Sequence, residues 1–186
     1  MASVLLWVLV GILAILLIWI ISAFNRLISL RNQIENSWSQ IDVQLKRRYD
    51  LIPNLVRTVK GYARHEKETF EQITKARTAA MSAKTLPERA KQENIISGAL
   101  KTLFAVAENY PRLLASENFK MLQEELSSTE SKIAYSRQFY NDSILSYDNA
   151  RRTFPGNIIA SMFNFKEQKE YFRAEESEKK AVKVEF

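Results

Sequence analysis

The residues that could do chemistry are few, and the most suggestive of them is a single histidine. The segment His65-Glu66-Lys67-Glu68-Thr69 begins like the helical zinc-protease motif, in which a second histidine lies four residues after the first. Thr69 stands at that position, and the chain has no cysteine and no other histidine. A zinc site would need carboxylate ligands alone, which suits zinc poorly. We therefore interpret His65 as a surface or packing residue.

Carboxylates are more numerous, but their spacing does not define a catalytic centre. On a long helix, acidic residues form solvated faces and i,i+4 pairs with basic residues more often than a divalent-ion site. We therefore interpret four acidic residues as members of solvated faces and i,i+4 pairs: Glu124, Glu125, Glu130 and Asp142. The sequence also lacks a glycine-rich phosphate loop and a Gly-x-Ser-x-Gly elbow. We therefore expect no catalytic residue, no metal ligand and no cofactor, and a protein that is not an enzyme.

Amides and charges of both signs gather near Pro53. The cluster consists of Gln40, Asp42, Arg47, Arg48, Asp50 and Asn54. Because proline has no N–H and Asp50 could cap a new helix, we expect a break or kink at residues 49–53. The amide of Asn54 is suited to donate to a carbonyl that Pro53 frees, which is the functional alternative. We favour a structural network of Arg48, Asp50, Pro53 and Asn54 that fixes helix register.

A short apolar segment near the C-terminal end is the strongest candidate for binding a partner. It lies between Arg152 and Lys166 and carries no charge. It is too short to cross a membrane and too apolar for a free loop. The segment either caps the end of a bundle or docks a partner. The candidate residues are Phe154, Ile158, Ile159, Met162, Phe163 and Phe165.

The N-terminal stretch indicates a membrane anchor that must position everything after it. No ionisable side chain occurs from Met1 to Asn25, and fifteen of the twenty-three residues from Ala2 to Phe24 are Val, Leu, Ile or Phe. At roughly −0.4 kcal/mol each, insertion is favoured by about 6 kcal/mol. The stretch spans about 34 Å as a helix, enough to cross a hydrocarbon core of about 30 Å. It lacks the basic start and short apolar core of a cleaved signal peptide, so residues 1–25 are interpreted as an uncleaved anchor.

The charges after the anchor predict its orientation. The first cations are the membrane-proximal Arg26 and Arg31, which favours a cytoplasmic C-terminal side and an N-terminus outside. Residues 26–60 hold seven basic and three acidic side chains, and residues 61–110 hold eight and six, whereas the rest of the chain is balanced. The net charge of +6 therefore lies nearer the membrane. This distribution favours contact with anionic lipid headgroups over contact with nucleic acid. We do not expect nucleic acid as a partner.

Apolar spacing beyond the anchor predicts an all-α fold. No glycine or proline lies between Gly11 and Pro53, so anchor and domain can share one helix. Apolar residues then recur at spacings of three and four, and the stripe from Phe119 to Phe154 predicts a helix of about 35 residues. Thr85 marks another helix start. We expect an antiparallel bundle of three to four long helices over residues 26–165, followed by a charged tail at 166–186.

Two long strings in this sequence resemble the LemA family of bacterial membrane proteins. The first is WSQIDVQLKRRYDLIPNLVRTVKGYARHE from Trp38 to Glu66, and the second runs from Tyr110 to Phe165 and includes YPRLLASENFKMLQEEL and SYDNARRTFPGNIIA. Ser131 departs from the family, which usually has asparagine there. The resemblance implies a single-pass protein of the bacterial cytoplasmic (inner) membrane, a cytoplasmic helical bundle and no established enzymatic activity. By the same resemblance, members of the family are associated with membrane-protein quality control near zinc membrane proteases. A relative in the magnetosome membrane takes part in membrane remodelling.

Two functions fit these expectations. The first is a non-enzymatic membrane scaffold or adaptor whose bundle, with coiled-coil-like packing, binds another membrane protein, a membrane protease being one candidate, or a second copy of itself as a homo-oligomer. The second is a membrane-organising protein that oligomerises and contacts anionic lipid. In both, the lipid bilayer is a partner.

Overall fold

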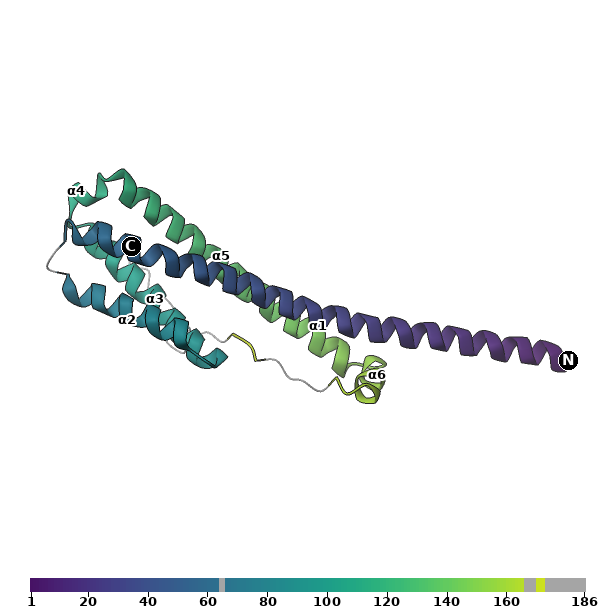
Figure 1. Cartoon of the computed structure of the whole chain (residues 1–186). Coiled ribbons are helices and arrows are strands. Elements are labelled where there is room, and N and C mark those ends of the chain that lie inside the picture. The colour runs from purple at the N-terminus through teal and green to yellow at the C-terminus, as the bar shows by residue number, and fades with distance from the viewer. Residues whose placement is uncertain (64–65, 166–169, 173–186) are drawn as a thin grey trace, which may run out of the picture. The chain divides into compact units, whose positions relative to one another are not determined.

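The computed structural model describes residues 1–63, 66–165 and 170–172, and these residues form an all-helical protein (Figure 1). His65 lies outside the described residues, as does most of the predicted tail. The expected fold class is therefore confirmed. The helices are α1 (Ala2–Lys60), α2 (Lys67–Ser82), α3 (Leu86–Ala107), α4 (Pro111–Leu114), α5 (Glu117–Arg152) and α6 (Gly156–Met162).

The chain divides into two compact units, and α1 and α5 supply residues to both. Unit 1 consists of residues 1–39 and 138–169, and unit 2 of residues 40–137 and 170–186. The predicted long helix at Phe119 to Phe154 is confirmed by α5, which has 36 residues. The anchor stretch and the apolar stripe after it also belong to one helix, α1, as the absence of Gly and Pro between Gly11 and Pro53 predicts.

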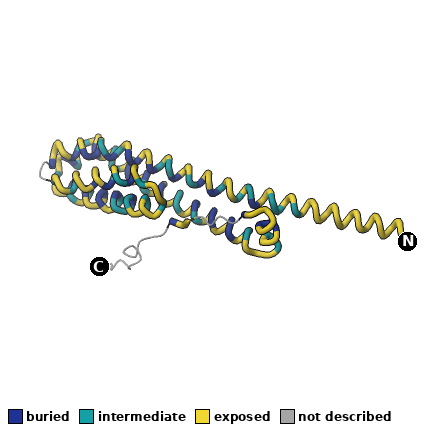
Figure 2. Tube along the Cα trace, turned by 60° about the horizontal axis from the view of Figure 1, so that its bottom comes forward, coloured by how far each residue is buried: buried dark blue, intermediate teal, exposed yellow. Residues whose placement is uncertain are grey.

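Unit 2 is built from four long helical segments around an apolar core. Residues 83–85 connect α2 to α3, which pack against one another as a helical hairpin. The hydroxyl of Thr85 accepts a hydrogen bond from the backbone N–H of Glu88 at 3.4 Å, so the predicted helix start is confirmed. Spacings of three and four bring one face of each helix inward (Figure 2). The core side chains include Ile41, Leu45, Leu55, Ile73, Ile96, Leu103, Phe119 and Leu126.

Of the break or kink expected at residues 49–53, the break is wrong, because α1 continues through Pro53 to Lys60. A proline inside a helix leaves the carbonyl four residues earlier without its N–H donor, and here that carbonyl belongs to Tyr49. Nε of Arg77 in α2 donates to this oxygen at 2.7 Å. The helix therefore tolerates Pro53 because a neighbouring helix replaces the lost hydrogen bond. Asp50 does not cap a new helix and instead pairs with Lys46, with Oδ2 3.0 Å from Nζ.

Unit 1 joins the N-terminal part of α1 to the C-terminal part of α5 and to α6. Every residue of α1 up to Trp19 is exposed, and this part of the helix has a mean hydropathy of 3.2 over 18 residues, enough to cross a membrane by length and composition. Burial begins with Leu27. The rings of Trp38 and Tyr140 then lie 5.5 Å apart, which joins α1 to α5 by aromatic packing.

Candidate functional site

The most concentrated polar chemistry in unit 2 is a buried network centred on Arg48 of α1. Its guanidinium contacts the carboxylates of Glu93 in α3 and Glu130 in α5, and donates to Ser97 Oγ at 3.0 Å. Ser97 donates in turn to Glu130 at 2.7 Å, and the Tyr49 hydroxyl donates to Glu93. One arginine thus ties α1 to two other helices.

The Arg48 network is closed to solvent at its centre. The side chains of Arg48 and Glu93 are fully buried, and Glu130 is about one third exposed. Removing one member of a buried ion pair leaves an uncompensated charge and costs about 3–5 kcal/mol. The arrangement therefore fixes which residues of α1, α3 and α5 lie opposite one another.

The predicted cluster near Pro53 is divided among several partners. Of its members only Arg48 enters the buried network. Four others pair separately: Asp42 with Arg89 at 2.8 Å, Arg47 with Glu125, Asp50 with Lys46, and Asn54 with Arg57 at 2.6 Å, whereas Gln40 is exposed on the surface. Asn54 accepts through its amide oxygen and lies on the surface, so Arg77 fills the donor role that the sequence assigned to Asn54.

Sequence reasoning missed Glu93, although a signal for it was present. Glu93 precedes Ile96, Leu100 and Leu103 at spacings of three and four, so a charged residue stands on the buried stripe of α3. A carboxylate at such a position requires a buried partner. Ser131, which differs from the usual family residue, is exposed, and its hydroxyl donates to the Ser127 carbonyl.

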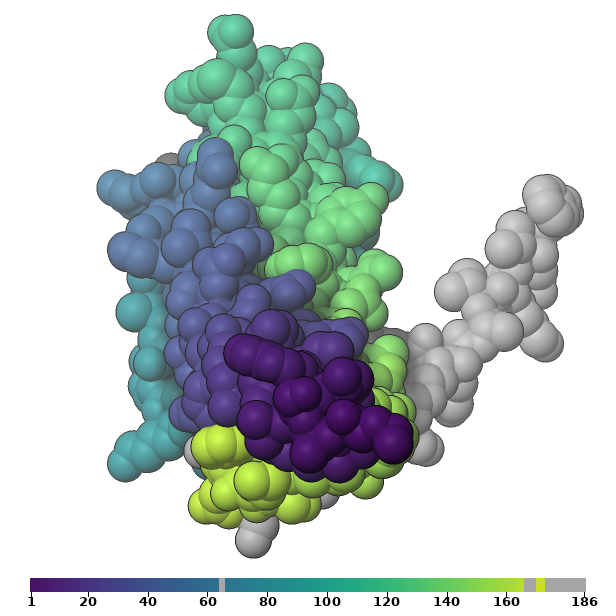
Figure 3. Space-filling model, turned by 90° about the vertical axis from the view of Figure 1, so that its right-hand side faces the viewer, coloured from purple at the N-terminus to yellow at the C-terminus, as the bar shows by residue number. Residues whose placement is uncertain are grey.

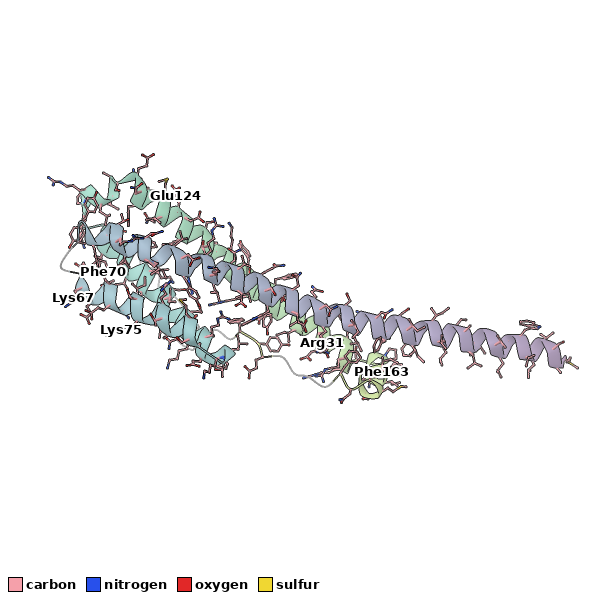
Figure 4. All side chains as sticks on the ribbon, viewed as in Figure 1. Arg31, Lys67, Phe70, Lys75, Glu124 and Phe163 are labelled. Carbon is pink, nitrogen blue, oxygen red and sulfur yellow. The ribbon has the colours of Figure 1, made fainter. Side chains whose placement is uncertain are left out.

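A basic surface at the start of α2 was also not predicted. Figure 4 labels Lys67, Phe70 and Lys75 on this helix. The Lys60 ammonium lies 5.6 Å from the centre of the Phe70 ring, and Glu71 lies 3.9 Å from Lys67 and 4.0 Å from Lys75. The lysines are thus held by an aromatic face and a carboxylate on an exposed surface.

One hydroxyl beside the start of α2 has a shifted pKa. Tyr110, which precedes α4, donates a hydrogen bond from its hydroxyl to Glu66 at 3.3 Å. Desolvation, followed by the negative charge of Glu66, raises the pKa of Tyr110 above its usual value. The contact fixes the turn between α3 and α4 against the residue that precedes α2.

A groove opens on the surface of unit 2 between α1 and α5. It encloses about 450 Å³. Its lining mixes amides, a hydroxyl, a carboxylate and two apolar side chains: Asn54, Thr58, Asn118, Met121, Leu122 and Glu125. Met121 is 55% exposed. This groove offers a partner both apolar contact and hydrogen bonds.

The apolar candidates at residues 154–165 are split between packing and exposure. Ile159, Ala160 and Phe165 are buried within unit 1, so part of the segment covers the end of the helices there. The rings of Phe163 and Phe165 lie 4.8 Å and 5.6 Å from the ring of Phe24 in α1. The remaining candidates are exposed: Phe154, Ile158, Met162 and Phe163.

Local contacts place this segment tightly against the end of α5. A Cβ added at Gly156 would come within 2.1 Å of the Ala150 carbonyl oxygen, so only glycine permits this approach. Asp148 pairs with Arg151 at 3.2 Å, and Arg151 donates to the Phe165 carbonyl at 3.4 Å. The turn from α5 into α6 is therefore held by backbone proximity and by the ion pairs of Asp148 with Arg151 and Arg152.

A second groove in unit 1 lies at the level where the anchor ends. It encloses about 600 Å³ between α1 and the turn from α5 to α6. The polar residues that line it are Ser22, Arg26, Ser146, Asn149 and Thr153, and the apolar ones include Trp19, Leu27, Leu30 and Phe154. Figure 4 labels Arg31 and Phe163, which belong to the same unit.

Comparison with known proteins now identifies the family. The family model described as "LemA family" matches residues 37–186. A protein named LemA from Metamycoplasma hominis is 31% identical over 140 residues, covering 73% of this chain and 63% of the relative. Magnetosome protein MamQ 2 of Paramagnetospirillum magneticum is 25% identical over 176 residues, covering 81% of this chain and 64% of the relative. Magnetosome protein MamQ of Magnetospirillum gryphiswaldense is 23% identical over 175 residues, covering 80% and 64%. This chain thus spans just under two thirds of the length of these relatives, and none of the three names denotes an enzymatic activity. The chain belongs to the LemA family.

Proposed function

We propose that this chain is a non-catalytic, single-pass membrane adaptor whose helical bundle binds another membrane protein. The start of α1 crosses the bacterial inner membrane with the N-terminus outside, and the remainder lies in the cytoplasm. The bundle holds its partner without chemical turnover. A membrane protease of the quality-control system is one candidate partner, and a second copy of this chain is another.

The anchor part of the proposal is supported by the exposed apolar surface of α1. The side chains up to Trp19 are exposed and uncharged, and such a surface is stable in lipid but not in water. Arg26 and Arg31 follow directly, which supports a cytoplasmic C-terminal side through the positive-inside rule.

The single observation that carries the adaptor part is the buried pairing of Arg48 with Glu93. An enzyme with its active site in a cleft exposes charged side chains to the substrate. The Arg48–Glu93 pair is instead enclosed by helices and holds them together. What unit 2 presents outward is helix surface, including the groove beside Met121. A packed bundle with an open groove is suited to holding a partner.

The experiment is affinity capture of the full-length chain from its native membrane after chemical crosslinking. The matched variant is Met121→Lys, which places a charge in the groove of unit 2 and leaves the core unchanged. We expect a discrete membrane protein that is captured by the parent and lost from the variant. Equal capture by both chains would remove the groove from the proposal, and a reproducible hydrolase activity of the purified chain would overturn the proposal as a whole.

The alternative is a membrane-organising protein that oligomerises and contacts anionic lipid. The exposed apolar side chains of α6 favour it, because Gly156 at the start of α6 lines the same groove as Arg26, the first cation after the anchor. Two of the relatives named above are magnetosome proteins, which also supports a role at membranes. If the chain captures no protein but clusters in anionic vesicles, this alternative replaces the adaptor.

A further inference from the structure

The exposed apolar side chains around α6 form a surface without charge. No ionisable side chain occurs from Thr153 to Phe165. Within this stretch Phe154 is 81% exposed, Met162 65% and Ile158 47%. Such a concentration of exposed large apolar residues marks a contact with a protein partner or with a membrane.

The position of α6 shows which apolar phase is near. Phe24 is the last residue of the apolar stretch that begins at Ala2, and that stretch is about as long as the hydrocarbon core is thick. Phe163 directly follows α6, and its ring lies 4.8 Å from that of Phe24. When α1 spans a bilayer, α6 therefore lies at the level where hydrocarbon meets headgroups. Figure 3 views the molecule from the N-terminal end of α1, and Figure 1 shows that α6 lies well behind that end, beside a later part of the helix.

The faces of α6 fit a helix that lies along this boundary. Ile159 and Ala160 point into unit 1 and are buried. Ile158 and Met162, one turn apart, form an exposed apolar edge, whereas Asn157 and Ser161, also one turn apart, form an exposed polar edge. A helix in the plane of the interface needs this division between lipid and water.

We propose that α6 lies in the interface of the bilayer that α1 crosses, with Phe154, Ile158 and Met162 in contact with lipid. The segment is a second membrane contact, which fixes unit 1 against the bilayer surface. Arg26, two residues after Phe24, is exposed and lies at the headgroup level in this arrangement. The inference rests on the anchor part of the proposed function and is independent of the adaptor part.

The chain contains no cysteine, so a single spin label can be placed at will. The full-length variants Ile158→Cys and Met162→Cys are labelled and reconstituted in vesicles of phosphatidylcholine and phosphatidylglycerol. Collision of the label with oxygen, which concentrates in lipid, is compared with collision with a water-soluble nickel complex. The controls are Leu9→Cys in the anchor, Asn157→Cys on the polar edge of α6, and Tyr135→Cys on the exposed surface of unit 2. Circular dichroism checks that each variant keeps the helicity of the parent.

We expect the labels at 158 and 162 to have oxygen-to-nickel ratios close to that at 9 and higher than those at 157 and 135. Water-like ratios at 158 and 162, with a lipid-like ratio at 9, would overturn the inference and leave the anchor intact. Labels at 158 and 162 that are shielded from both reagents would show that protein covers this edge and would also overturn it. A water-like ratio at 9 would defeat the anchor and the inference together.

Discussion

Arg77 donates a hydrogen bond from Nε to the backbone carbonyl oxygen of Tyr49 at 2.7 Å, and this carbonyl is the one that Pro53 deprives of its helical donor. A side chain of α2 thereby allows α1 to continue through a proline. The same contact joins the two helices. Pro53 therefore leaves a carbonyl oxygen between α1 and α2 that needs a hydrogen-bond donor from α2.

The first prediction concerns the coupling between Arg77 and Pro53. Arg77→Met leaves the Tyr49 carbonyl without a donor and is expected to lower the free energy of unfolding by about 1–3 kcal/mol. In a Pro53→Ala background the residue at 53 supplies its own N–H, so the same change should cost less. The coupling is measured by urea unfolding in detergent, followed by circular dichroism, of the parent, the two single variants and the double variant. Strictly additive effects would show that Arg77 does not replace the missing donor.

The second prediction concerns the buried charge network. Arg48→Met removes the cation from Glu93 and Glu130 and is expected to lower the free energy of unfolding by about 3–5 kcal/mol. Arg47→Met is the matched control, because the adjacent Arg47 is half exposed where it pairs with Glu125, and a loss below about 1 kcal/mol is expected. Equal losses in the two variants would contradict the assignment of Arg48 as the residue that joins the helices.

The third prediction concerns Gly156. An alanine Cβ there would meet the Ala150 carbonyl oxygen at 2.1 Å, so Gly156→Ala should displace α6 from the end of α5. Backbone amides of α6 should then exchange with solvent faster. At Gly98, in the exposed middle of α3, nothing lies within 4 Å of an added Cβ, and Gly98→Ala should stabilise the chain by about 0.5–1 kcal/mol. Unchanged exchange in the Gly156→Ala chain would refute the close approach.

The fourth prediction concerns alkaline pH. Because the pKa of Tyr110 is raised in the folded state, its hydroxyl holds the proton more tightly there than in the unfolded chain. The resulting stability is complete below the ordinary value of 10.0 and is lost as the pH rises through the folded value. Unfolding of the parent should therefore become easier above pH 10 to a greater extent than unfolding of the Tyr110→Phe chain. Parallel pH profiles for the two chains would contradict this linkage.

Much of the fold could be predicted because apolar spacing and capping chemistry are local signals. The stripe from Phe119 to Phe154 predicted α5, and Thr85 predicted the start of α3. The continuity of α1 could not be predicted past Pro53, because it depends on Arg77, 24 residues later in the chain. A proline that can break a helix is recognised from the local sequence, whereas the side chain that replaces its missing hydrogen bond comes from another helix.

The candidate sites show the same limit. The sequence predicts that Arg48 belongs to a structural network. Its partners Glu93, Ser97 and Glu130 follow only from the packing of three helices. The lack of charge from Phe154 to Phe165 predicts the apolar segment. Which of its residues face inward depends on contact with Phe24, and spacing within the segment does not reveal that contact.

The central claim, that the groove of unit 2 binds a membrane protein, is tested most directly by photo-crosslinking in living cells. A photoreactive amino acid replaces Met121 in the full-length chain, and the matched control replaces Ser127, which is exposed on a different side of α5. The account predicts that position 121 crosslinks to one discrete membrane protein and that position 127 crosslinks to none. The crosslinked protein is either a different protein or a second copy of the chain. Crosslinks from position 121 to lipid alone, or the same proteins from both positions, would contradict it.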